Sequence, residues 1–182
     1  MNSAQGGDLT SKPLIIDKPL IIDKPLIVGI DPGWASGAIA VFNRVERRIV
    51  AVVDMPQSAK AMAREIDLID GHPSRLALAI VEVVGSRPGE GVVSVFNFGR
   101  NAGVIDGVLA ALGIRTEMVV PAVWKMNMNV SADKRTSMEM AKKLFPAWHA
   151  FHAKDFTLAK NSGRAEAALM AIYGERFLKG CP

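Results

Sequence analysis

The sequence predicts an α/β fold, and three observations lead to this prediction. The apolar run from Leu26 to Ile30 is typical of a buried central strand, and the acid and Pro-Gly pair after it predict a turn. Apolar strand-like runs then alternate with segments of helical periodicity. The chain has 182 residues, 49% of them hydrophobic and 22% charged, which is enough for one globular domain with a substantial core.

Residues 1–25 are predicted to form a flexible N-terminal extension, and residues 26–182 the main domain. The extension contains three copies of Lys-Pro-Leu-Ile at intervals of six residues, the last of which leads into the first strand. Prolines at this spacing exclude a helix and disfavour a central strand. Two interpretations of the other copies are open: a segment that lies along a sheet edge or another subunit, and a duplication without function.

The first three strands are expected at 26–30, 37–42 and 49–54, where short gaps between apolar runs predict an antiparallel meander. A serine start, helical periodicity and a glycine stop predict a helix at 58–71. The continuous apolar run at 76–84 predicts a buried strand, and a further strand is expected at 115–120.

The helix expected at 93–112 contains Gly99, Gly103 and Gly107 on one face. Each interior glycine costs about 1 kcal/mol relative to alanine. The three together therefore indicate the close approach of another backbone, either that of the sheet or that of a second subunit.

After Pro121, the patterns become weaker. We expect an irregular, methionine-rich loop from Trp124, a basic helix from Ser131 to Phe145 with Ser131 or Asp133 as its cap, and a weakly patterned, mobile segment at 146–162. The spacing of apolar residues predicts a final amphipathic helix at 163–178.

The net charge is +4 with a pI near 9.4, and the basic residues are unevenly distributed. Between Trp124 and Arg164, eight basic residues (Lys125, Lys134, Arg135, Lys142, Lys143, Lys154, Lys160, Arg164) stand against three acids (Asp133, Glu139, Asp155). Such a surface attracts a polyanion. A solvated, lysine-rich helix face explains the charge equally well.

Several classes of protein are disfavoured by the composition. The single cysteine, Cys181, excludes an internal disulfide framework and fits a reducing compartment. No apolar run approaches the roughly 18 residues that span a bilayer, and the N-terminus lacks the layout of a signal peptide. We therefore expect a cytoplasmic protein with no membrane partner.

Three carboxylates stand out by their context. Asp31 ends the first strand, Glu82 interrupts the apolar run of the fourth, and Glu166 lies near the start of the last helix. If the first and fourth strands are neighbours and this helix crosses them, the three form a hard-oxygen site suited to Mg²⁺ or Mn²⁺. Two such ions, about 3.5–4 Å apart, can activate water and stabilise a leaving oxygen. For Glu82, a structural ion pair is the alternative.

The motifs around these carboxylates resemble one family. The segments Gly29–Gly33, Val81-Glu82, Phe96–Gly103, Pro121–Lys125 and Gly163–Leu169 are similar, in order and spacing, to the phage- and prophage-encoded branch of RuvC-like Holliday-junction resolvases. The resemblance covers about Leu26 to Phe177. It implies an RNase H-like fold, a five-stranded mixed β-sheet flanked by α-helices, and a metal-dependent endonuclease that cuts branched DNA symmetrically, acting in the bacterial host cytosol if phage-encoded.

The resemblance also implies roles for individual residues. Asp31, Glu82 and Glu166 correspond to catalytic, metal-binding carboxylates, with two ions expected per site. The helix at 93–112 occupies the position that forms the homodimer, and a two-fold dimer matches the two equivalent strands of a four-way junction. The candidate DNA-binding residues are Arg87, Phe96, Phe98, Arg100, Lys125 and Lys134. For the two phenylalanines, stacking on unpaired bases competes with ordinary core packing.

One departure from the family pattern affects the catalytic set. Asn161 and Ser162 stand where the family carries a further acid or a histidine, and Ser162, four residues before Glu166, is the better match. A hydroxyl is a poor ligand for a hard dication. The second ion is then weakly held, or Asp155 or His152 substitutes, or the chain is catalytically impaired, naturally or by substitution. Ser162 can also simply cap the helix.

Three hypotheses about function therefore remain in play. The first is a structure-selective endonuclease acting on Holliday or other branched DNA. The second is a dimer descended from such a nuclease that binds branched DNA without cutting it. The third is a fragment of an actin-like ATPase, against which the short chain and the lack of a second phosphate-binding glycine loop both argue. We expect no nucleotide cofactor.

Overall fold

The computed structural model describes residues 24–68, 75–83, 85, 89, 91–157 and 162–179. The first two copies of the repeat, Arg87, Asn161 and Cys181 lie outside the described residues. The expectations about the N-terminal extension and about these positions therefore stay predictions.

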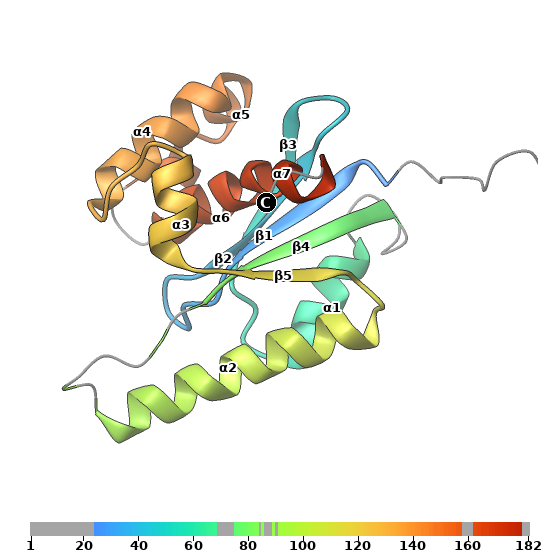
Figure 1. Cartoon of the computed structure of the whole chain (residues 1–182), viewed down its shortest axis with the longest axis vertical. Coiled ribbons are helices and arrows are strands. Elements are labelled where there is room, and N and C mark those ends of the chain that lie inside the picture. Colours follow the sequence, from blue (N-terminus) through green and yellow to red (C-terminus); the bar gives the residue numbers. More distant parts are fainter. Residues whose placement is uncertain are drawn as a thin grey trace, which may run out of the picture.

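A five-stranded mixed sheet forms the centre of the domain (Figure 1). Its order is β3-β2-β1-β4-β5. The strands are β1 (Leu26–Asp31), β2 (Ala38–Asn43), β3 (Arg48–Asp54), β4 (Leu76–Glu82) and β5 (Thr116–Val119). The first three pair antiparallel, while β4 runs parallel to β1 and β5 parallel to β4. The predicted fold class and the predicted meander are thus confirmed.

Helices cover both faces of the sheet (Figure 1). On one face lie α1 (Ala59–Leu68) and α2 (Val92–Ala111). On the other lie α3 (Pro121–Asn127), α4 (Lys134–Leu144), α5 (Pro146–Phe151), the 3₁₀ helix η3 (Ala153–Phe156), α6 (Ser162–Tyr173) and α7 (Glu175–Leu178). Among the described residues, no helix is both long and apolar enough to cross a bilayer.

The central strand β1 is buried on both faces, which explains its continuous apolar sequence. Side chains alternate along a strand, so Leu26, Val28 and Ile30 enter the core beneath α1 and α2, whereas Ile27 enters the core beneath α6. Asp31 belongs to the same alternate series as Ile27. The alternation therefore directs this carboxylate toward the face that α6 covers.

Helix α6 differs from the expected amphipathic helix, because ten of its twelve residues are buried. It packs against β1 and β2 on one side and against α4 on another, so most of its circumference is covered. A helix enclosed in this way is apolar all round. Glu166 is thus a charged residue inside a core helix.

The segment after β5 is more regular than the sequence suggested. Trp124 lies in helix α3 rather than in a loop, and Pro121 starts that helix at a position where proline is well tolerated. Residues expected to be weakly patterned and mobile form α5 and η3, which the fully buried Phe156 anchors. These helices have only four to seven residues, too few to show a clear period. The basic helix α4 begins at Lys134, and Asp133 caps it by accepting a hydrogen bond from the Arg135 amide at 2.9 Å.

The glycine face of α2 is exposed. A Cβ atom added at Gly99, Gly103 or Gly107 would meet no other atom within 4 Å in the described part of the chain. Close approach to the sheet is therefore the wrong explanation of these glycines. The alternative, a second subunit, stays a prediction.

Candidate active site

Asp31 and Glu82 end two neighbouring parallel strands at the same edge of the sheet. The register pairs Ile30 of β1 with Val81 of β4, and the two carboxylates are the next residues along each strand. Glu82 follows Leu78 and Ile80, which enter the core beneath α6, so both carboxylates face that helix. The proposed neighbour relation of the first and fourth strands is confirmed.

Two glycines allow α6 to approach these strand ends. A Cβ atom at Gly29 would lie 2.0 Å from the carbonyl oxygen of Ala167, and one at Gly163 would lie 2.0 Å from that of Ser36. The Gly163 position is also 2.8 Å from Asp31 Oδ2. Only glycine permits such contact between backbones. The sequence motifs contain both glycines, but their role in close packing was not foreseen, although a glycine inside a buried strand is a signal of close packing.

Because α6 lies this close to the strands, Glu166 lines the same cleft as Asp31 and Glu82. The cleft has a volume of about 870 Å³, and its lining also includes Ser36, Phe98, Lys125, Ser131 and Lys134. Its walls thus come from β1, β4, α2, α3, α4 and α6. The three carboxylates singled out in the sequence come together in space.

Burial raises the pKa of Asp31 to about 6. The Gly33 amide, which donates to Asp31 Oδ1 at 3.1 Å, and the charge of Lys134 lower this pKa, whereas the charges of Glu82 and Glu166 raise it. The carboxylates thus repel one another in a poorly solvated place. A bound cation would relieve that repulsion.

Burial also raises the pKa of Glu82, and the main opposing influence is Trp124. The indole Nε1–H of Trp124 donates to Glu82 Oε1 at 2.9 Å, and the indole ring is fully buried. The sequence predicts a loop at Trp124, and no pattern along the chain indicates this contact. Trp124 holds the Glu82 carboxylate in one orientation.

Two lysines face the carboxylates. Lys125 Nζ lies 2.6 Å from Glu166 Oε1, and Ser137 Oγ donates to the same oxygen at 3.4 Å. Lys134 Nζ donates to the buried Ser162 Oγ at 3.2 Å. Both lysines were expected to contact phosphates, and both are found where their charge acts on the carboxylate cluster.

The two suggested substitutes for a missing ligand are engaged elsewhere. Asp155 accepts hydrogen bonds from Trp148 Nε1 at 3.0 Å and from Arg164, and neither Asp155 nor His152 lines the cleft. The His152 ring stacks on Trp148 with centroids 4.1 Å apart. Substitution by either residue is therefore not supported, and Ser162 remains at the position.

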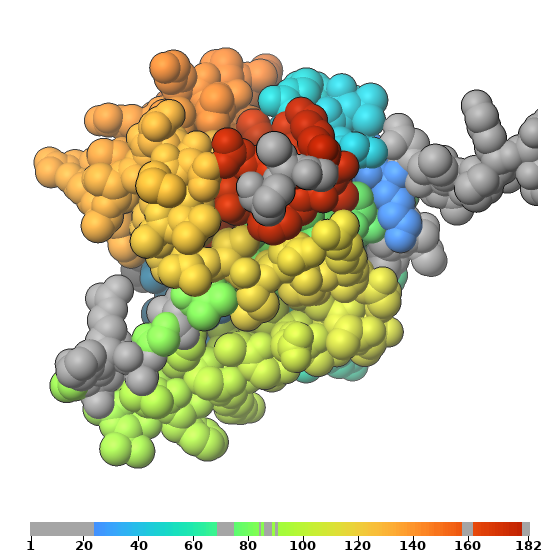
Figure 2. All heavy atoms as spheres, viewed as in Figure 1, coloured from blue at the N-terminus to red at the C-terminus, as the bar shows by residue number. Residues whose placement is uncertain are grey.

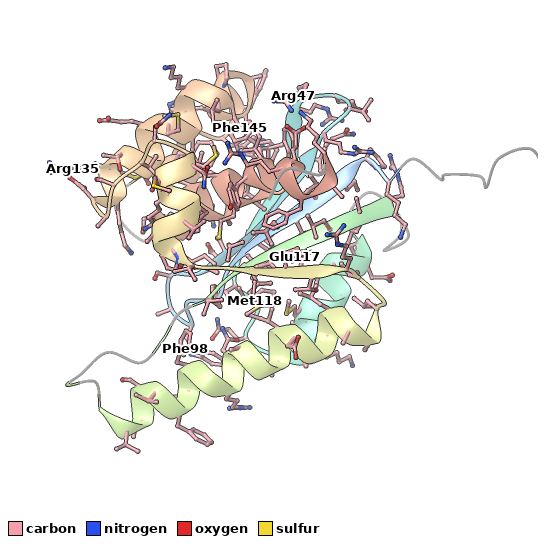
Figure 3. The ribbon with its side chains drawn as sticks, in the orientation of Figure 1. Arg47, Phe98, Glu117, Met118, Arg135 and Phe145 are labelled. Carbon is pink, nitrogen blue, oxygen red and sulfur yellow. The ribbon has the colours of Figure 1, made fainter. Side chains whose placement is uncertain are left out.

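The aromatic candidates lie outside the core. Phe98 is half-buried and lines the cleft, and Figure 3 shows its side chain on the side of α2 that faces the sheet. Phe96 is 68% exposed, and Arg100 is also exposed on α2. Core packing is therefore the wrong interpretation of Phe96. Arg87 lies outside the described residues.

The donor chemistry of the cleft fits a hard divalent cation, because three carboxylates from three elements reach it. Asp31, Glu82 and Glu166 are the residues that would hold the ion. In the described residues, however, no three His, Cys, Asp or Glu side chains are already gathered closely enough to bind a metal. Glu166 is paired with Lys125, so binding an ion requires this ion pair to open or to be shared.

Comparison with known proteins finds solved structures with a similar fold. No family model and no curated protein matches the chain. Thermus thermophilus RuvC in complex with a Holliday junction substrate has a TM-score of 0.61 and 19% identity, over 85% of this chain and 95% of that one. A second structure of Thermus thermophilus RuvC has a TM-score of 0.57 and 18% identity, over 85% and 96%. The chain therefore shares the fold of RuvC, a five-stranded mixed sheet flanked by helices, as the family resemblance implies.

Proposed function

We propose that this chain is a metal-dependent endonuclease that resolves Holliday junctions or other branched DNA by symmetric phosphodiester hydrolysis. The observation that carries the proposal is the convergence of Asp31, Glu82 and Glu166 in one cleft of a fold shared with RuvC. One of the similar structures is that of RuvC bound to a junction substrate. From the motifs quoted above, we further propose that the chain belongs to the phage and prophage branch of RuvC-like resolvases. We also propose that it acts in the cytoplasm, in keeping with its single cysteine.

In this proposal, Asp31, Glu82 and Glu166 hold Mg²⁺ or Mn²⁺. A bound divalent cation supplies Lewis acidity and lowers the pKa of a coordinated water. Trp124 and the Gly33 amide orient two of the carboxylates through their hydrogen bonds. Lys125 and Lys134 neutralise charge in the cleft and attract the scissile phosphate.

The DNA-binding residues are proposed from the sequence, and Phe98, Lys125 and Lys134 are supported by their place in the lining of the cleft. Phe98, at the cleft, and Phe96, exposed on α2, offer aromatic faces for unpaired bases near a branch point. Arg100 and Arg87 are proposed to contact phosphates, which positions DNA without reading its sequence. Branched DNA supplies what both kinds of residue need, unpaired bases beside closely spaced phosphates.

Helix α2 is proposed to form a two-fold dimer. Its first half extends beyond the body of the domain, at the lower left in Figure 2. That half exposes Val92, Val93 and Phe96, and the glycine face continues along the helix. An apolar projection with small residues allows two helices to pack closely. A two-fold axis would present two equivalent clefts to the two equivalent strands of a junction.

A second candidate function is a dimer that binds branched DNA without cutting it. Two observations favour it. Ser162 stands where a metal ligand is expected, and the Glu166 carboxylate is already paired with the Lys125 ammonium. Both reduce the capacity of the cleft for metal ions.

Cleavage of a labelled four-way junction, compared with a linear duplex of the same sequence, tests the two functions in Mg²⁺ and in Mn²⁺. We expect paired, symmetric cuts in the junction and none in the duplex, and loss of the cuts in Asp31→Asn. Ser162→Asp is tested in parallel. If neither the original chain nor Ser162→Asp cuts while both bind the junction, the non-cutting dimer replaces the endonuclease.

A further inference from the structure

We propose that the carboxylate cleft holds one divalent cation rather than two, and that the Lys134 ammonium, held by Ser162, supplies the positive charge of the second. This inference rests on the proposed endonuclease function and specifies how its active site is charged. It replaces the expectation of two ions per site.

The position of Lys134 is the first support. Its Nζ donates to Ser162 Oγ at 3.2 Å, and Ser162 is only 3% exposed and lies one helical turn before Glu166. Both Lys134 and Glu166 line the cleft. An ammonium group therefore already stands beside Ser162, the position where the family pattern expects the further ligand.

The acid next to Lys134 in the sequence pairs with another residue, so it does not neutralise the charge that Lys134 brings to the cleft. The preceding residue, Asp133, caps α4 and pairs with Arg135, whose Nη2 lies 2.6 Å from Asp133 Oδ2. The nearest acid in sequence is thus engaged by another cation. Consistent with this, the charge of Lys134 lowers the pKa of both Asp31 and Glu82, against the effect of burial.

The hydroxyl of Ser162 cannot replace a carboxylate. It carries no charge, and one of its lone pairs already accepts the hydrogen bond from Lys134. A hard dication prefers anionic oxygen ligands. The Ser162–Lys134 pair thus takes the place that an acid and a second ion would fill.

The sum of the charges that line the cleft also favours one divalent cation. Three carboxylates line the cleft, and Lys125 and Lys134 offset two of their charges, which leaves one net negative charge. One dication would reverse this to one positive charge, which a single phosphodiester of the substrate neutralises. Two dications would leave an excess positive charge beside the three carboxylates, which are buried, so the electrostatic cost would be high.

The test counts Mn²⁺ ions bound to the full chain at neutral pH, by electron paramagnetic resonance of free Mn²⁺. We expect one ion per chain that is lost in Asp31→Asn. Ser162→Asp combined with Lys134→Met should bind two, because it exchanges the ammonium for a carboxylate. Ser162→Asp alone should still bind one, since the new carboxylate pairs with Lys134.

Junction cleavage with single substitutions provides a second measurement that does not depend on the folding of the double variant. Lys134 is exposed at the start of α4, so Lys134→Met should fold normally. We expect it to keep one ion but to lose about 100-fold in cleavage rate, with most of the rate restored in Lys134→Arg. Lys143→Met removes an exposed lysine of the same helix outside the cleft and is the matched control.

The outcomes separate this inference from the proposed function. Two site-bound ions in the original chain, or none, would overturn the inference, as would unchanged cleavage in Lys134→Met. If the chain binds two ions and cuts the junction, the proposed endonuclease function stands and the inference of one ion is wrong. One ion, lost in Asp31→Asn, without cleavage of any branched DNA confirms the ion count and refutes the endonuclease.

Discussion

Lys125 Nζ lies 2.6 Å from Glu166 Oε1, and the side chains of the pair are only 18% and 6% exposed. The two residues come from α3 and α6, so the ion pair joins the helix after the last strand to the helix that crosses the sheet. A cation that binds Glu166 must share this carboxylate with Lys125 or displace Lys125 from it. The strength of this ion pair should therefore affect both the stability of the fold and the binding of a cation in the cleft.

Lys125→Met should destabilise the protein. The substitution keeps most of the aliphatic stem but leaves the buried Glu166 carboxylate without its cation, which costs about 3 kcal/mol in the free energy of unfolding. Urea denaturation measures the loss. Lys143→Met, which removes an exposed lysine of α4, is the control and should change stability by less than about 0.5 kcal/mol. Equal midpoints for the two variants would show that the ion pair contributes nothing.

Asp31→Asn should stabilise the protein at neutral pH, because Asp31 is buried in its charged form. Its pKa is about 6 in the folded state and near 3.8 when unfolded, so between these values the folded state binds more protons. The contribution of Asp31 to stability therefore falls as the pH rises from about 4 to about 6, and then stays constant.

The expected gain for Asp31→Asn in metal-free buffer is about 3 kcal/mol at pH 7 and should disappear toward pH 4. Thermal or urea unfolding across this pH range measures it. Asp106→Asn, an exposed carboxylate of α2, provides the comparison. A gain for Asp31→Asn that does not depend on pH would contradict the assignment to charge burial.

Trp124→Phe should impair Glu82 in particular. The substitution removes the Nε1–H that donates to Glu82 at 2.9 Å and leaves a buried carboxylate oxygen without that partner. We expect a loss of about 2 kcal/mol in stability and a rise in the pKa of Glu82. Junction cleavage should therefore need a higher pH than in the original chain.

The pH–rate profile distinguishes this positioning role from a general loss of packing. Trp34→Phe changes an indole that is 41% exposed and should leave the profile where it is. If Trp124→Phe lowers the cleavage rate equally at every pH, the hydrogen bond does not tune Glu82.

Gly103→Leu should weaken self-association through α2. Gly103 has open space around it in the described chain, so leucine is accommodated in a monomer and improves helix propensity. In a close helix–helix contact, the same side chain would separate the two backbones. We expect a dimer for the original chain and a mainly monomeric variant in analytical ultracentrifugation.

Two results would contradict the proposed dimer. One is a monomeric original chain at concentrations where junctions are bound, and the other is an unchanged dimer in Gly103→Leu. The variant's own folding is checked by circular dichroism, since a destabilised helix would also lower the dimer population.

Local patterns were sufficient for much of the fold. The strand from Leu26 to Asp31 is apolar on both faces because helices cover both sides of it, and such a run is visible without the structure. Asp31 and Glu82 were also recognisable, since an acid at the end of an apolar run or inside one needs an explanation, whereas Glu166 was singled out by its place near the start of the last helix. The order of the five strands and of the longer helices α1, α2, α4 and α6 followed from the same kind of pattern.

Short helices and buried contacts were not predictable in this way. Helices α3 and α5 have seven and six residues, too few for a period, and tertiary packing around Trp124 and Phe156 holds this part of the chain in place. The exposure of the α2 glycines also required the structure, because the glycine pattern fits a contact with the sheet equally well.

By itself, the sequence determined the order of the strands and longer helices and which acids end apolar strands, because both depend on residues close together in the chain. Only the tertiary structure decided the partners of those acids. Trp124 bonds Glu82 across 42 residues, and Lys134 bonds Ser162 across 28. Such pairs depend on how α3, α4 and α6 pack over the sheet, and no periodicity along the chain encodes that packing.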